Sequence, residues 1–206
     1  MRNCHLPSIE VLPSLVPMMR IWQVTVFFCA TTVAALADEA LAAFQWEPPK
    51  VRVSLFSNEL GLLESEREDY ATNLAIIASN HVAETKAAPA AVMAARRMIG
   101  LALQLSPRNK KAVVANFQLA KGFLPERAEG NYTPQTFARL LLTRGQVLEK
   151  QEGDENKKVA RYFTQLAAEL DPKNEDAVYA SEVQRLDHGP LNWGIITDPE
   201  EKSPEP

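Results

Sequence analysis

The sequence predicts an all-α fold, and three observations support that prediction. Long windows without proline are rich in Ala, Leu, Glu, Gln, Lys and Arg, which have the highest helix propensities, whereas Pro is worse than Ala by about 3 kcal/mol. One stretch of the chain repeats 65 residues later. Most predicted helices are joined by short turns, which make consecutive helices antiparallel neighbours. The proline-free windows are 50–88, 90–106, 108–124, 135–171 and 173–189.

Helix start and stop signals divide these windows into six helices. Residues 51–56 alternate apolar and polar side chains and predict an extended stretch before the first helix. Ser57 or Ser65 is expected to start that helix, the latter in a capping box with Glu68. Gly153 breaks the fourth window, and Asp154 is the expected N-cap of the next helix. The expected helices are 58–86, 90–106, 108–122, 134–151, 154–170 and 173–187, and the one long connection is 123–133.

The N-terminal region resembles a secretory signal peptide. Arg20 is followed by the uncharged run Ile21–Ala37, which ends in small residues before Asp38. A positive flank, an apolar core and a small-x-small end are the parts of such a signal, so cleavage is expected after Ala37. The triplet Ala40-Leu41-Ala42 offers a second cleavage point a few residues later. An uncleaved anchor helix is the alternative, because a run of this length is at the lower limit for spanning a bilayer.

Residues 1–17 do not belong to such a signal, because they contain three prolines and an acidic residue. Met18 or Met19 is a natural start, so this stretch is interpreted as an artefact of start-codon choice. The chain's two cysteines, Cys4 and Cys29, both lie in the part expected to be removed. The mature protein is therefore expected to have no disulfide and no cysteine-bound metal.

The remaining chain divides into three parts. Residues 38–57 form an extended leader, residues 58–187 a helical repeat domain, and residues 188–206 a loosely ordered tail rich in proline and acidic residues. Such a composition is typical of weakly attached segments. Leu191 and Trp193 are exceptions within the tail, and they either pack on the last helix or form an exposed docking motif.

The internal repeat aligns Ala95–Ala115 with Ala160–Ala180. Small alanines let two helices approach closely, a leucine completes the core, and the proline ends the helix. The asparagine that follows is expected to cap the next helix. The identical pairs are Ala95/Ala160, Arg96/Arg161, Leu101/Leu166, Ala102/Ala167, Leu105/Leu170, Pro107/Pro172, Asn109/Asn174, Ala112/Ala177, Val113/Val178 and Ala115/Ala180.

This pattern resembles the tetratricopeptide repeat family, whose unit is a helical hairpin of about 34 residues. The resemblance covers residues 58–187 and implies a right-handed superhelix of about three antiparallel hairpins. The bulky aromatic and the Leu-Gly pair of the family's first helix are missing, and the 123–133 connection is longer than usual, so Sel1-like or other hairpin solenoids stay open. The matching residues are Ala95, Ile99, Ala102 and Pro107, then Ala160, Phe163 or Thr164, Ala167 and Pro172.

Signals for catalysis are weak, and the sequence predicts neither an enzyme nor a cofactor. Two histidines, His81 and His188, remain after processing, and no zinc, nucleophile-elbow or phosphate-loop motif accompanies them. The acidic stretches 64–69 and 152–155 lack the spacing of a calcium loop and are interpreted as solvated helix faces and caps. With 22 basic and 26 acidic side chains the net charge is −4, which argues against nucleic acid as a partner.

The remaining function is recognition by shape. If the resemblance holds, first helices of stacked hairpins line a concave groove that holds a protein or peptide partner. The expected function is that of a binding or scaffolding module that is exported to the periplasm or cell envelope. One alternative is a structural subunit of an envelope complex, anchored in the membrane by residues 21–37. The other is an enzyme that uses carboxylates without a known motif. The residues expected in the groove are Lys111, Val114, Gln118, Lys121 and Arg139.

Overall fold

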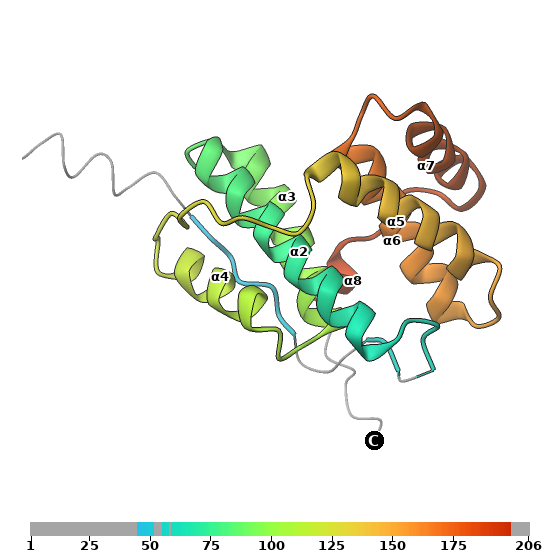
Figure 1. The fold of residues 1–206 in the computed structure, drawn as a ribbon, viewed down its shortest axis with the longest axis horizontal. Coiled ribbons are helices and arrows are strands. Elements are labelled where there is room, and N and C mark those ends of the chain that lie inside the picture. Colours follow the sequence, from blue (N-terminus) through green and yellow to red (C-terminus); the bar gives the residue numbers. More distant parts are fainter. Residues whose placement is uncertain (1–44, 52–54, 58, 199–206) are drawn as a thin grey trace, which may run out of the picture. The chain divides into compact units, whose positions relative to one another are not determined.

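A computed structural model describes residues 45–51, 55–57 and 59–198 (Figure 1). Every regular element in these ranges is a helix, which confirms the all-α class. The expected signal region, start site, cysteines, cleavage points and residues 199–206 lie outside the described residues. The helices are α2 (Glu64–Glu84), α3 (Pro89–Leu105), α4 (Lys110–Ala120), α5 (Pro134–Glu149), α6 (Asp154–Leu170), α7 (Glu175–His188) and the short α8 (Gly194–Thr197).

The six long helices form two groups of three. In the first unit, which comprises α2, α3 and α4, α2 pairs with α3 and α4 packs on both. In the second unit, which comprises α5, α6 and α7, α5 pairs with α6, and α7 packs mainly on α6. Three successive hairpins would pair α4 with α5, but the main helix packings of the described residues do not include that pair. The long connection after α4 separates the two helices, so the chain is grouped as three helices plus three.

The repeat found in the sequence is the repeat of these units. Helices α3 and α6 begin and end 65 residues apart, and α4 and α7 begin 65 residues apart. The predicted small residues lie in the core: Ala95, Ala102 and their partners Ala160 and Ala167 are fully buried. Gly145 brings α5 close to α6, because a Cβ there would lie 3.1 Å from the Ala160 carbonyl oxygen. Small side chains therefore set the helix spacing within each unit.

Two of the predicted N-caps are confirmed. The side-chain oxygen of Asn109 accepts from the Ala112 N–H at 2.9 Å, and that of Asn174 accepts from the Ala177 N–H at 3.2 Å. Asp154 is not a cap, since the helix already begins there and Gly153 holds the N-cap position with φ +102°. Only glycine adopts such a backbone angle without strain, so the chain reverses at this residue.

The start of α2 differs from both predicted positions. Leu63 is the N-cap, and the Glu66 carboxylate accepts from its N–H at 2.9 Å, so neither Ser57 nor Ser65 begins the helix. Ser57 instead donates from its N–H and hydroxyl to Glu155 on α6, at 2.8 and 2.9 Å. The predicted capping box does not form, because Glu68 accepts from Asn109 at 2.8 Å. Tertiary partners therefore override the local helix signal.

One tyrosine joins the two units. The ring of Tyr70 on α2 lies 6.1 Å from that of Phe137 on α5 and 5.1 Å from that of Phe163 on α6. Burial, and after it the neighbouring Glu66 carboxylate, raise the pKa of Tyr70 to about 12. Arg144 on α5 adds a polar link, because it donates to Glu66 at 2.9 Å. The units share one hydrophobic core.

Residues 189–198 pack on the helices, which differs from the expected loose tail. Trp193 and Ile196 are buried, and the Trp193 ring lies 4.8 Å from that of Tyr162 on α6. Arg97 of α3 lies over the same indole, 5.6 Å from its centroid. Arg96 donates to both carboxylate oxygens of Asp198, at 2.9 and 2.7 Å. Trp193 therefore anchors this segment on α3 and α6. The alternative prediction, that Trp193 belongs to an exposed docking motif, is wrong.

Candidate functional site

Each unit has a groove between its first and third helices, and equivalent residues line the two grooves. The α2/α4 groove and the α5/α7 groove are named here after the helices that form them. On α4 the lining residues are Lys111, Val114, Ala115 and Gln118. The residues 65 positions later, Asp176, Tyr179, Ala180 and Val183, line the α5/α7 groove from α7. The internal repeat therefore produces two versions of one surface.

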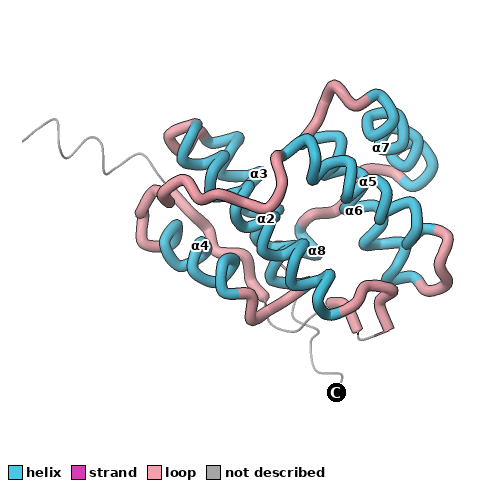
Figure 2. The backbone as a smooth tube through the Cα atoms, viewed as in Figure 1, coloured by secondary structure: helices cyan, strands magenta, loops and turns pink. Residues whose placement is uncertain are grey.

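The α2/α4 groove is occupied by the chain itself. The connection from α4 to α5 runs back over α2 as a long loop (Figure 2), and its residues 123–130, named here the loop segment, have no helix or strand. The Asn80 amide of α2 donates to the Ala128 carbonyl oxygen and accepts from the Ala128 N–H, both at 2.9 Å. Pro125 is buried. A cavity of about 360 Å³ remains beside the loop segment.

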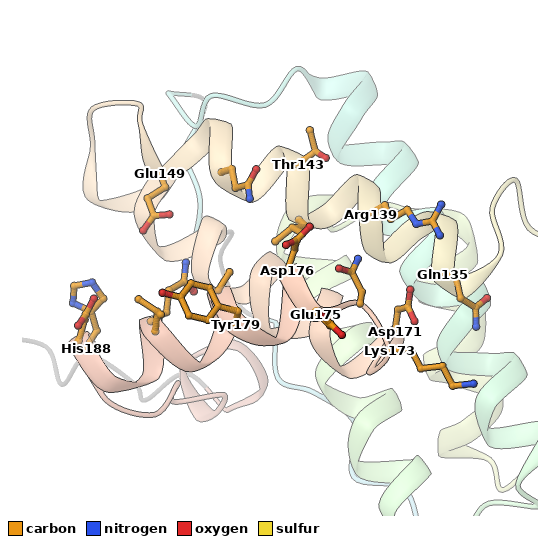
Figure 3. A pocket seen from close by; sticks show the side chains of 17 residues that line it. Gln135, Arg139, Thr143, Glu149, Asp171, Lys173, Glu175, Asp176, Tyr179 and His188 are labelled. Atoms are coloured by element: carbon orange, nitrogen blue, oxygen red, sulfur yellow. The ribbon is translucent and has the colours of Figure 1, made fainter.

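The α5/α7 groove contains no such segment among the described residues. Its cavity measures about 1110 Å³, and α5 and α7 form its two walls (Figure 3). Tyr179 lies in the middle of the groove and is 73% exposed, while Arg139 and Glu149 lie toward opposite ends. This volume is slightly larger than the 300 to 1,000 Å³ that ligand sites typically have.

The α5/α7 groove is acidic. Two of its lining residues are basic, Arg139 and Lys173. The equivalent wall of the α2/α4 groove has the opposite charge, since Lys111 corresponds to Asp176. The two grooves therefore differ in the sign of their charge at an equivalent position. The acidic lining residues are Glu149, Asp171, Glu175, Asp176 and Asp187.

The structure places four of the five predicted site residues in the two grooves. Lys111, Val114 and Gln118 line the α2/α4 groove together with the loop segment. Lys121 is the C-cap of α4, and its Nζ lies 5.7 Å from the centre of the Phe117 ring rather than in a groove. Arg139 lines the α5/α7 groove from α5.

Sequence reasoning missed the α7 wall of the open groove. Asp176, Tyr179 and Val183 occupy positions 65 residues after Lys111, Val114 and Gln118. The repeat offset applied to the predicted residues would have found them. The other wall could not be found in this way, because the sequences of α2 and α5 share no comparable pattern.

His188 and five carboxylates line the α5/α7 groove, but they form no metal-binding group. Within the described ranges, no three His, Cys, Asp or Glu side chains are placed to hold a metal ion. Nor does any described helix have the length and hydropathy needed to cross a bilayer. His81 lines a separate cavity of about 250 Å³ with Met98 of α3 and Leu166 of α6. Comparisons with protein-family models, curated proteins and solved structures found no match to this chain.

Proposed function

We propose that this protein is a non-catalytic binding or scaffolding module that holds an extended segment of a partner protein in its α5/α7 groove. The observation that carries the proposal is the filled state of the equivalent α2/α4 groove. There the loop segment lies against the same positions of α4 that line the open groove on α7. The loop segment in the first unit is therefore our guide to the kind of segment that would fit the α5/α7 groove of the second.

The occupied groove also indicates how such a segment is held. Asn80 binds the N–H and the carbonyl oxygen of one residue, Ala128, and so reads backbone rather than side chain. Recognition of an extended peptide commonly divides in this way, with backbone hydrogen bonds for affinity and pockets for specificity. In the open groove Gln146 of α5 and Gln184 of α7 offer the same amide chemistry, and Leu142 and Val183 offer apolar surface.

Charge defines the partner more closely. The acidic α5/α7 groove favours a segment with Lys or Arg side chains, since opposite charges speed encounter and fix register. Asp176 stands where the occupied groove has Lys111, and that lysine shares its groove with Glu126 of the loop segment. A basic residue is therefore expected at the corresponding position of the partner.

The proposed setting is the periplasm or cell envelope. It rests on the sequence of residues 20–37, whose charged flank, apolar core and small-residue end are typical of an export signal. In that setting a small helical module without catalytic groups would act by bringing a partner segment to a fixed place.

Selection from a displayed library of random octapeptides tests the binding proposal without a known partner. The full chain is expected to enrich peptides that combine Lys or Arg with apolar residues. Asp176→Lys is expected to weaken binding of the enriched peptides about tenfold, because one reversed charge changes a desolvated contact by roughly 1.4 kcal/mol. Lys111→Asp, at the equivalent position of the occupied groove, is the matched control. Equal enrichment on the chain and on Asp176→Lys would overturn the proposal.

A further inference from the structure

The outer surface of α4 combines exposed apolar and basic side chains. Phe117 is 61% exposed and Phe123 is 65% exposed. Isolated exposed apolar residues are ordinary, but a cluster rimmed by charge marks an interaction site. The group is named here the α4 face, and it comprises Val113, Val114, Phe117, Phe123 and Leu124 with Arg108, Lys110, Lys111 and Lys121, all exposed.

Helix geometry directs most of these side chains outward, while Lys111, Val114 and Leu124 also border the α2/α4 groove. Ala112, Ala115 and Leu119 are the buried residues of α4, so the helix presents its opposite side to solvent. Residues three and four apart share a side of a helix, which places Lys110, Phe117 and Lys121 on that outer side. The basic residues lie toward both ends of the helix, and the apolar ones lie between them.

The turn after α4 extends the same surface. Gly122 has φ +75°, and the N–H groups of Gly122 and Phe123 donate to the carbonyl oxygens of Leu119 and Gln118, at 2.9 and 3.0 Å. This pair of bonds is the Schellman arrangement, which needs a residue in the left-handed region. The turn leaves Phe123 and Leu124 exposed just beyond the helix end.

The charge of the α4 face has one sign. No Asp or Glu occurs from Pro107 to Pro125, although the whole chain has a net charge of −4. Glu68 of α2 lies near the start of α4, where its carboxylate accepts hydrogen bonds from Ser106 and Asn109. Glu126 follows in the loop segment and lines the groove side.

Helix α7 provides an internal comparison for this face. Exposed apolar residues occur at the same two positions of each helix, Val113 and Val114 on α4 and Val178 and Tyr179 on α7. The charged positions differ in sign, because Lys110 corresponds to Glu175. The position of Phe117 on α4 is taken by Glu182 on α7, and that of Lys111 by Asp176. The combination of cations with exposed aromatic rings is therefore particular to the first unit.

We propose that the α4 face docks onto the surface of an anionic lipid membrane. Phe117, Phe123 and Leu124 enter the boundary between headgroups and acyl chains, and the lysines and Arg108 pair with lipid phosphates, as in helices that lie in the plane of a membrane interface. The aliphatic part of a lysine side chain can lie along apolar surface while its ammonium group reaches the phosphates, and Lys121 already lies over the Phe117 ring.

The route of the chain favours a membrane over a protein as the occupant. The Trp46 indole donates to the Asn116 side-chain oxygen of α4 at 3.0 Å, so the described chain begins beside this helix. The apolar run Ile21–Ala37 lies only nine residues before Trp46 in the sequence. If the run stays attached, as in the uncleaved-anchor alternative, a link of this length keeps α4 within reach of the surface that the run contacts.

Cosedimentation of the full chain with phospholipid vesicles tests the docking. We expect binding to phosphatidylcholine vesicles containing about one third phosphatidylglycerol, and binding at least about tenfold weaker when Lys110→Glu and Phe117→Glu are combined, since each cation near an anionic surface and each inserted ring contributes. These changes install the residues found on α7. Val178→Ser with Tyr179→Ser is the matched control and is expected to leave binding unchanged. All variants share residues 1–44, so any contribution of the apolar run cancels.

A spectroscopic measurement locates the contact independently of total binding. Measured against the parent chain, which has three tryptophans of its own, Phe117→Trp is expected to add blue-shifted emission with the phosphatidylglycerol vesicles and none with phosphatidylcholine alone, whereas Tyr179→Trp is expected to add no shift with either. Equal binding of the double α4 variant and the parent, together with an unshifted tryptophan at 117, would overturn the proposal. The α4 variants leave the lining of the α5/α7 groove intact, so loss of vesicle binding in them is a separate result from loss of peptide binding.

Discussion

The two units have nearly the same helical plan but differ in how their third helix is held. Helix α4 buries Ala112, Ala115 and Leu119, whereas α7 buries only Ala177. The loop segment covers the groove beside α4, while the groove beside α7 stays open. A duplicated sequence therefore gives one groove that the chain covers and one that the described residues leave open. The difference comes from the connection between the helices rather than from the helices themselves.

The largest expected effect comes from removing an aromatic ring that both units share in their core. Phe163 is fully buried on α6 and contacts Tyr70 of the other unit, so Phe163→Ala is expected to lower the free energy of unfolding by about 3–5 kcal/mol. Denaturant titration followed by circular dichroism and by tryptophan fluorescence measures it, and both signals are expected to change together. Phe117→Ala, an exposed phenylalanine, is the control, with an effect within about 0.5 kcal/mol. Two separate transitions in the parent would show that the units fold independently.

The two asparagine caps sharpen the comparison at equivalent positions. Asn109 is buried and also donates to Glu68 and Thr72, each at 2.8 Å, whereas Asn174 is half-buried and caps its helix. Asn109→Ala is therefore expected to cost about 2–3 kcal/mol of unfolding free energy and Asn174→Ala about 1 kcal/mol. Thermal denaturation of both variants measures the difference, and equal losses would argue that the additional bonds of Asn109 contribute nothing.

Release of the loop segment would make the first unit resemble the second. Asn80→Ala removes both hydrogen bonds to Ala128 and is expected to lower stability by about 1–2 kcal/mol. The larger consequence is local, because residues 123–130 then open more often and become sensitive to protease. Limited proteolysis with mapping of the cut site measures this. Gln146→Ala on α5 should leave the cleavage rate unchanged, and an unchanged rate in Asn80→Ala would contradict the role given to Asn80.

The smallest expected effect concerns pH. The Arg96 guanidinium bound to Asp198 holds the pKa of that carboxyl below its usual value. A carboxyl whose pKa is lower in the folded state contributes stability above its unfolded value, near 3.8, and loses it as the pH falls through the folded value. Asp198→Asn should therefore reduce the acid sensitivity of the 189–198 segment, with little effect at pH 7 because the pair is exposed. Hydrogen exchange of Ile196 and Thr197 between pH 3 and pH 6 would measure it.

Local features of the fold were predictable from the sequence. Asn109 and Asn174 cap their helices, and the four repeat alanines are buried, because these roles depend on the nearest turns of the chain. The start of α2 was not predictable, since Ser57 bonds to Glu155 and Glu68 to Asn109, across long separations in sequence. Propensity describes the helix and not the partners that fix its end.

The candidate site was predictable in part for the same reason. Helix position alone places Lys111, Val114 and Gln118 in a groove, and Arg139 in another. The loop segment fills the first groove through the hydrogen bonds between the Asn80 amide and the Ala128 backbone, and no sequence pattern predicts these bonds. The packed place of Trp193 is likewise a long-range result, because its partners Tyr162 and Arg97 come from two different helices.

The closure of the chain by residues 189–198 has a mechanical consequence. The Lys50 N–H donates to the Thr197 carbonyl oxygen at 2.8 Å, and Arg96 bonds to both Asp198 and the Glu47 carbonyl oxygen. The two ends of the described chain therefore lie side by side. Tension applied between them loads these bonds first, together with the Trp46 bond to Asn116 and the packing of Trp193 on Tyr162. A module tethered at both ends would yield in two steps, with its core protected during the first.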